Sequence, residues 1–186
     1  MGIKLKIWVV DDERIIRVTT ADDLRDAGYD VYEFTDAASM FNMLREDTPD
    51  LVITDIKMPG MDGIELLMKL KKIKNEVSVL MMTAFGTIEN AVKAMKLGAS
   101  DFITKPFTRE QLLVTVEKIL RVSSLQNENK ILRKQIRKKY DFSTYVGDSD
   151  TNKELFDQIK LVAKKDSTVL ITGETGTGKE LVTNII

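Results

Sequence analysis

Five short apolar runs alternate with segments of helical character over roughly the first 120 residues. The runs are rich in Val, Ile and Leu, and several are nearly continuous, which is typical of strands covered on both faces. We predict strands at Leu5–Val10, Val31–Phe34, Leu51–Thr54, Val77–Met82 and Asp101–Thr104, and helices at Glu13–Ala27, Ala37–Glu46, Asp62–Lys72 and Thr87–Leu97. This alternation predicts right-handed βαβ units and a five-stranded parallel sheet, and therefore an α/β fold.

Two missing residue types narrow the chemistry that this chain can perform. Its 186 residues include no Cys and no His, so disulfides, thiolate metal sites and a phosphohistidine of its own are excluded. The formal net charge of −1 gives no general attraction to nucleic acid. No apolar run approaches the roughly 20 residues that span a bilayer, and the N-terminus lacks a signal-peptide pattern. We therefore expect a cytoplasmic protein with no membrane partner.

Polar side chains stand at the carboxyl ends of four predicted strands, where parallel α/β sheets carry their chemistry. Asp11 and Asp12 follow the first strand, Asp55 the third, Thr83 the fourth and Lys105 the fifth. Three neighbouring carboxylates repel one another unless a hard divalent cation such as Mg²⁺ binds between them. One carboxylate could then attack a phosphoryl group whose oxygens contact the Lys and Thr side chains. Any single Asp here fits a helix cap or turn better, but the four strand ends together favour a site.

The segments that contain these residues resemble the receiver domain of two-component response regulators, over residues 1 to about 121. The matching segments are Val9–Glu13, Asp50–Gly63, Met82–Ala84 and Gly98–Phe107. The resemblance implies a doubly wound, flavodoxin-like sheet with the strand order 2-1-3-4-5.

The same resemblance implies a role for each matching residue. Asp55 corresponds to the phospho-acceptor, which takes its phosphoryl group from a separate sensor histidine kinase. The residues that correspond to Mg²⁺ ligands are Asp11, Asp12, Asp55 and, through its backbone carbonyl, Lys57. Thr83 and Lys105 correspond to the pair that contacts the phosphoryl group, and Phe102 corresponds to the switch aromatic. The Lys105–Pro106 bond corresponds to a cis peptide, which proteins nearly confine to bonds before Pro.

A different pattern begins at Thr108, because neither Gly nor Pro occurs from there to Lys139. Thr108 and Gln111 fit a capping box at the start of one long helix. From Val122 onward the apolar positions fit a heptad seam with Asn129 at an a position, which favours a parallel homodimer. A single solvated helix with a chance apolar stripe is the alternative. We expect a receiver domain at residues 1–121 and a coiled-coil linker at 122–142.

A Gly-rich loop follows a further predicted strand, Thr168–Thr172, and opens a helix, which is the context of a P-loop. In such a loop Gly173, Gly176 and Gly178 let backbone N–H groups turn toward phosphate, and Lys179 reaches the outer phosphates. Glu180 stands where most P-loops carry Ser or Thr. This departure, the preceding residues 169–173 and the segment 145–149 resemble the start of the AAA+ domain of sigma-54-dependent, NtrC-like activators. We assign residues 143–186 to it; a Gly-rich turn that binds nothing is the alternative.

The two resemblances imply a response regulator of sigma-54-dependent transcription, of which this chain is read as an N-terminal fragment with a truncated AAA+ domain. Phosphorylation of Asp55 would repack a receiver dimer and control assembly of the ATPase. In the intact protein the partners would be sigma-54 RNA polymerase and promoter DNA. ATP is expected only where the AAA+ domain is complete, so this chain should show only phospho-acceptance and slow self-dephosphorylation. The alternatives are a mainly ATP-hydrolysing protein and a constitutive dimerisation scaffold.

Overall fold

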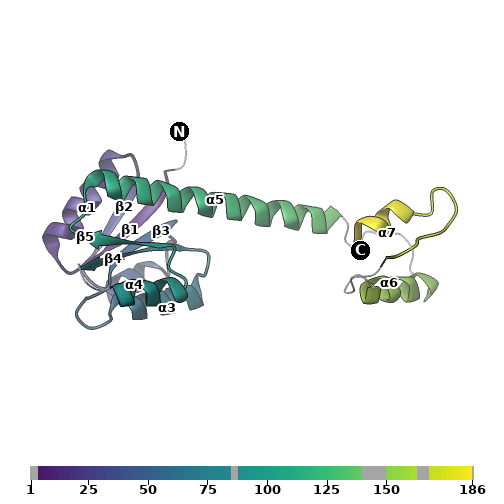
Figure 1. Ribbon diagram of the computed structural model, residues 1–186, viewed down its shortest axis with the longest axis horizontal. Coiled ribbons are helices and arrows are strands. Elements are labelled where there is room, and N and C mark those ends of the chain that lie inside the picture. Colours follow the sequence, from purple (N-terminus) through teal and green to yellow (C-terminus); the bar gives the residue numbers. More distant parts are fainter. Residues whose placement is uncertain (1–3, 85–87, 140–149, 163–167, 186) are drawn as a thin grey trace. The chain divides into compact units, whose positions relative to one another are not determined.

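The computed structural model describes residues 4–84, 88–139, 150–162 and 168–185 (Figure 1). The chain divides into two compact units, Met1–Leu125 and Gln126–Ile186, and each is described by itself. The expected helix start at Thr87 and the motif at residues 145–149 lie outside the described residues. Within the described part, none of the helices combines the length and apolarity that crossing a bilayer requires.

The first unit is built on one five-stranded sheet in which every pairing is parallel. Its strands are β1 (Lys6–Val10), β2 (Asp30–Phe34), β3 (Leu51–Asp55), β4 (Ser78–Ala84) and β5 (Asp101–Lys105). Their order is β2-β1-β3-β4-β5, which confirms the α/β prediction and the order implied by the resemblance. The register aligns Val10 with Thr54 and Ala84 with Lys105, so the carboxyl ends of the strands meet at one edge.

Helices cover both faces of this sheet (Figure 1). They are α1 (Arg14–Asp26), α2 (Ala37–Met43), α3 (Gly63–Ile73), α4 (Ile88–Lys96) and α5 (Arg109–Lys139). Residues of β1 alternate between two cores: Ile7 packs with residues of α1 and α5, and Trp8 packs with residues of α2, α3 and α4. Because both faces are buried, the strand reads as a continuous apolar run.

Side-chain caps set several helix boundaries. Asp36 and Asp62 accept hydrogen bonds from backbone N–H groups in the first turns of α2 and α3, at 2.8 and 2.7 Å. The backbone N–H of Thr108 donates to Gln111 Oε1 at 2.9 Å, and the backbone N–H of Gln111 donates to Thr108 Oγ1 at 3.2 Å, which confirms the capping box. The predicted end of the second helix at Glu46 is wrong: α2 ends at Met43, and the next three residues form a turn in which the N–H groups of Arg45 and Glu46 donate to carbonyls three residues back.

Gly63 allows α3 to begin against the end of β3. Its backbone N–H donates to the Ile56 carbonyl at 2.8 Å. A Cβ atom at this position would lie 2.1 Å from the carbonyl oxygen of Asp55, far inside any real contact. Only glycine therefore permits this approach, which fixes the chain on both sides of the β3–α3 loop that carries Asp55 and Lys57.

The described part of the second unit contains helices α6 (Asp150–Val162) and α7 (Lys179–Ile185) in addition to the end of α5. The predicted strand at Thr168–Thr172 is wrong, since these residues have no hydrogen-bonded neighbouring strand within the described ranges. A β-strand is defined by its ladder, and an apolar run alone does not supply one.

Candidate functional site

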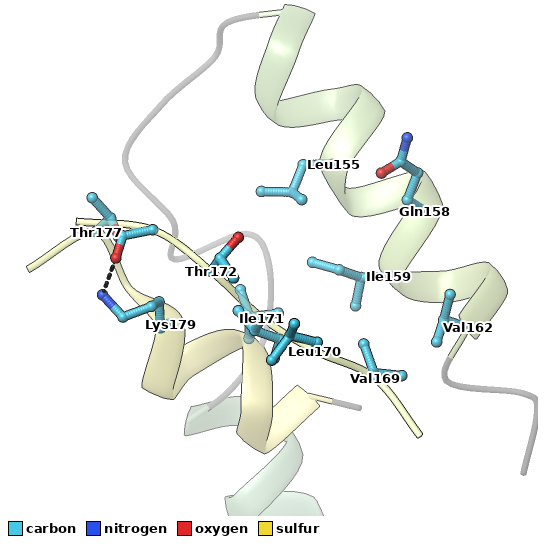
Figure 2. Close-up of a pocket in the computed structure, with 12 residues that line it drawn as sticks. Leu155, Gln158, Ile159, Val162, Val169, Leu170, Ile171, Thr172, Thr177 and Lys179 are labelled. Carbon is cyan, nitrogen blue, oxygen red and sulfur yellow. Dashed lines mark hydrogen bonds between the residues drawn. The ribbon is translucent and has the colours of Figure 1, made fainter. Parts of the chain in front are cut away.

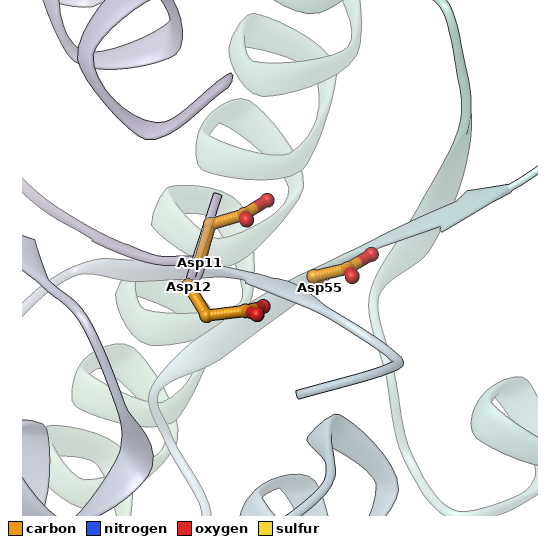
Figure 3. Close-up of side chains that lie close together, drawn as sticks. All are labelled: Asp11, Asp12 and Asp55. Carbon is orange, nitrogen blue, oxygen red and sulfur yellow. The ribbon is translucent and has the colours of Figure 1, made fainter. Parts of the chain in front are cut away.

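Three carboxylates gather at the edge where β1 and β3 end. One ligand oxygen from each of Asp11, Asp12 and Asp55 lies within 4.8 Å of the other two. Figure 3 shows the side chains of Asp11 and Asp12 extending toward the side on which Asp55 lies. Asp11 is fully buried, Asp55 is 7% exposed and Asp12 is exposed. An all-carboxylate set with one open side suits a hard divalent cation that keeps part of its water shell.

Lys105 joins two of these carboxylates from the end of β5. Its Nζ lies 2.7 Å from Asp11 Oδ2 and 3.2 Å from Asp55 Oδ1, and 3.9 Å from the more exposed carboxylate of Glu13. The Lys105 side chain is only 11% exposed, so little water screens the pairs. The peptide bond from Lys105 to Pro106 is cis, as the resemblance implies.

Burial and charge act against each other on the two central groups. Burial raises the pKa of the Asp55 carboxyl above its ordinary value; the Lys105 ammonium opposes this shift and the Asp11 carboxylate adds to it. Burial alone would lower the pKa of Lys105, but its hydrogen bond to Asp11 and the charges of Asp55 and Asp11 outweigh burial and raise it. Lys105 therefore stays a cation, and Asp55 is costly to ionise unless further positive charge is present.

The raised pKa of Asp55 predicts a pH-dependent loss of stability in the absence of metal. A carboxyl whose folded-state pKa is raised adds stability below its ordinary pKa and loses that contribution as pH rises through the raised value. In EDTA, Asp55→Asn should therefore melt above the parent at pH 7, with the gap closing as the pH falls toward the ordinary pKa of Asp, 3.8. Thermal unfolding monitored by circular dichroism measures this gap.

Glu46→Gln, at an exposed position of the same unit, is the control for removing one carboxylate, and we expect the gap between its unfolding midpoint and that of the parent to stay small. Parallel profiles for the parent and Asp55→Asn would contradict the assigned burial effect.

The remaining predicted residues of this site occupy different environments. Thr83 is 2% exposed at the end of β4, in register with Thr104, and so lies at the same sheet edge. Phe102 is 39% exposed on β5. Lys57 is exposed, two residues beyond Asp55. The structure thus brings Lys105 into contact with Asp11 and Asp55, and places Asp12 beside these two carboxylates.

Sequence reasoning missed Arg17. Its Nη1 donates to the backbone carbonyl of Asp11 at 2.7 Å. The position of Arg17 one helical turn beyond Glu13, on the helix that leaves the acidic pair, was an available signal.

In the second unit, the carbonyls of the Gly-rich loop bind the side chain of Lys179. Lys179 Nζ donates to the carbonyls of Gly173, at 2.8 Å, and Glu174. Gly176 and Gly178 have φ values of 87° and 84°, which are open mainly to glycine. Glu180 is exposed in the first turn of α7.

Beside the loop lies an apolar pocket of about 440 Å³. Figure 2 shows Leu155 and Ile159 of α6 facing the segment that includes Val169 and Ile171. Lys179 and Thr177 also line this pocket, so a phosphate-type loop and an apolar hollow are adjacent within this unit.

Comparisons with known proteins match two separate segments of the chain. Residues 7–117 match the model of the response regulator receiver domain, and residues 145–186 match that of the sigma-54 interaction domain. The C4-dicarboxylate transport transcriptional regulatory protein DctD of Rhizobium meliloti is 33% identical over 186 residues, covering 100% of this chain and 40% of its own length. The DNA-binding transcriptional regulator NtrC of Escherichia coli is 33% identical over 180 residues, covering 97% and 38%.

Solved structures agree with these matches. A crystal structure of NtrX from Brucella abortus has a TM-score of 0.73 at 38% identity, covering 98% of this chain and 40% of that one. A further NtrX structure, in complex with ATP, has a TM-score of 0.71. A receiver domain protein from Clostridium thermocellum covers 66% of this chain and 98% of its own, with a TM-score of 0.62. The chain thus spans about 40% of the length of the longer relatives that it matches.

Proposed function

Because the chain belongs to the response regulator receiver domain family and continues into the start of a sigma-54 interaction domain, we propose that it is a phosphorylation-controlled switch. Asp55 accepts the phosphoryl group. The observation that carries this proposal is the Lys105 ammonium, which lies 2.7 Å from Asp11 and 3.2 Å from Asp55 at the carboxylate cluster.

The donor set fits Mg²⁺. Asp11, Asp12 and Asp55 would hold the ion together with the backbone carbonyl of Lys57. When bound, the metal supplies positive charge to the oxygens of the phosphoryl group in transfer. The positive charge of the metal also offsets the free-energy cost of ionising Asp55 in its buried position.

The chain's own residues supply the rest of the transfer. An oxygen of ionised Asp55 attacks phosphorus; a new P–O bond forms while the bond to the leaving group breaks, and the leaving group takes that electron pair. Lys105 neutralises charge on the transferred group, and the hydroxyl of Thr83 bonds one of its oxygens. The resemblance to response regulators supports a phosphohistidine on a separate sensor kinase as the physiological donor, and this chain, which contains no His, cannot supply it.

The signal then passes to the dimer. We propose that Thr83 and Phe102 rearrange after phosphorylation and change the face formed by α4, β5 and α5. A receiver at 1–121 joins a coiled-coil linker at 122–142, where Val122 and Leu125 are 48% and 58% exposed on α5. Such exposed apolar side chains at heptad spacing support pairing with a second copy.

In the longer protein, residues 143–186 begin an AAA+ domain. Gly173, Gly176, Gly178, Lys179 and Glu180 would form its ATP loop, with Lys179 exchanging its contacts with loop carbonyls for contacts with phosphate. The matching NtrX of Brucella abortus has been solved in complex with ATP. We propose that phosphorylation controls assembly of this ATPase, which acts on sigma-54 RNA polymerase at promoter DNA.

The experiment that tests the function treats the chain with the small phosphoryl donor phosphoramidate and Mg²⁺. Intact-mass spectrometry of one portion counts the added phosphoryl groups. A second portion is treated with borohydride, which reduces the acyl phosphate to the alcohol of homoserine with loss of phosphate, and peptide mapping then locates the homoserine. We expect one added phosphoryl group per intact chain and, after reduction, homoserine at position 55 of the mapped peptide; neither should appear when EDTA replaces Mg²⁺. Modification of another carboxylate, or uptake that ignores EDTA, would contradict the proposal.

A further inference from the structure

Each polar atom of Asp11 has a hydrogen-bonding partner. Its backbone N–H donates to the Phe34 carbonyl at 3.1 Å. Its Oδ1 accepts from the Glu13 backbone N–H at 2.8 Å, and its Oδ2 accepts from Lys105 at 2.7 Å. The last atom, its carbonyl oxygen, accepts from Arg17 Nη1 at 2.7 Å. The main chain of Asp11 is therefore held both at its N–H and at its carbonyl oxygen.

Arg17 is itself held in place from β2. Its Nε lies 3.6 Å from Glu33 Oε2, and its side chain is only 11% exposed. Glu33 Oε1 accepts a hydrogen bond from Arg25 Nη2 at 2.9 Å. Glu33 directly precedes Phe34, so the end of β2 holds Asp11 by two routes. The Phe34 carbonyl bonds the Asp11 N–H, and Glu33 pairs with the Arg17 that bonds the Asp11 carbonyl.

We propose that Arg17, oriented by Glu33, is a positioning residue of the carboxylate site and sets its affinity for divalent cations. This inference rests on the proposed function, because it takes the cluster to be a metal site. Groups that orient metal ligands without touching the metal typically change metal affinity about 10- to 100-fold when they are removed. Arg17 acts in this way through the main chain of Asp11.

Two effects of Arg17 on a bound cation have opposite signs. Its positive charge repels a cation, so charge alone predicts tighter binding once Arg17 is removed. Its hydrogen bond fixes the chain that carries Asp11 and Asp12, so positioning predicts weaker binding. Glu33 offsets the charge of Arg17, which leaves positioning as the larger effect.

Arg17→Met keeps the length and packing of the stem while it removes the charge and the donors. We expect its affinity for Mn²⁺, followed by the electron paramagnetic resonance of free Mn²⁺, to fall about tenfold. Arg14→Met is the matched control, since it removes the same charge from an exposed position on the same helix; its affinity should equal or slightly exceed that of the parent. Arg17→Lys should recover part of the loss.

A charge-neutral variant, Arg17→Met with Glu33→Gln, keeps the result interpretable should the single variant fail to fold. Charge predicts no change for it, whereas positioning predicts the same weakening. Equal or tighter Mn²⁺ binding by the folded variants would overturn the inference and leave Asp55 phosphorylation standing. If the parent chain binds no Mn²⁺, the metal site is wrong and the inference falls with it.

Discussion

Replacing Asp55 with Asn is expected to abolish phosphoryl uptake and leave the fold intact. The amide has nearly the shape of the carboxylate but no anionic oxygen to attack phosphorus. Asp55 is 7% exposed beside Lys105, and the neutral side chain removes a buried charge. With phosphoramidate and Mg²⁺, intact-mass spectrometry should therefore show no added phosphoryl group on this variant.

Glu13→Gln is the control, because it removes a neighbouring carboxylate that lies 3.9 Å from the same Lys105 Nζ but is largely exposed. We expect this variant to keep most of its uptake. Labelling of Asp55→Asn, or loss of labelling in Glu13→Gln, would identify a different nucleophile. The pair of variants thus separates the nucleophile from a carboxylate that only lies near the same Lys105 ammonium.

The sheet was predictable because its strands are buried on both faces. Four consecutive residues are fully buried: Ile7, Trp8, Val9 and Val10. A continuous apolar run of this kind is typical of a strand covered on both faces. Alternation of strands and helices also predicted parallel pairing. It does not specify which strand lies in the centre, and the order came from the resemblance to receiver domains. The position of the carboxylates at one edge followed from parallel pairing alone, and the order placed the ends of β1 and β3 side by side.

The contacts that refine the site were not predictable in the same way. Lys105 pairs with Asp11 across 94 positions of sequence, and its reach depends on the register of the strands. Arg17 meets Glu33 only because β2 lies beside β1. Gly63 resembles any glycine before a helix until the carbonyl of Asp55 is placed against it.

The missing strand at Thr168–Thr172 has another cause. Apolar periodicity reports which side chains avoid water, and Ile171 does line an apolar pocket. Strand formation also needs a neighbouring chain that accepts and donates backbone hydrogen bonds. Local sequence carries no information on that neighbour.

Replacing Lys105 with Met should lower the unfolding free energy at pH 7 by about 3 kcal/mol in EDTA, because removing one partner of a buried ion pair leaves its charge uncompensated. Here two carboxylates, Asp11 and Asp55, lose the ammonium that lies 2.7 and 3.2 Å from them. Urea unfolding at pH 7 measures the loss. Lys118→Met is the matched control: its ammonium pairs with Asp101 at 2.9 Å but is 69% exposed, so we expect a cost below about 1 kcal/mol.

Saturating Mg²⁺ should then narrow the difference in unfolding free energy between the parent and Lys105→Met. A cation bound at Asp11, Asp12 and Asp55 replaces the positive charge that the substitution removes. A ligand at 100 times its dissociation constant stabilises a folded chain by about 2.7 kcal/mol. The gain should be larger in the variant, where no ammonium competes for the two buried carboxylates. Lowering the pH should also narrow the gap, since loss of Lys105 raises the pKa of Asp55 further and protonation relieves the repulsion. Equal costs for Lys105→Met and Lys118→Met, or a gap that ignores Mg²⁺, would show that Lys105 serves packing rather than the charge balance of the site.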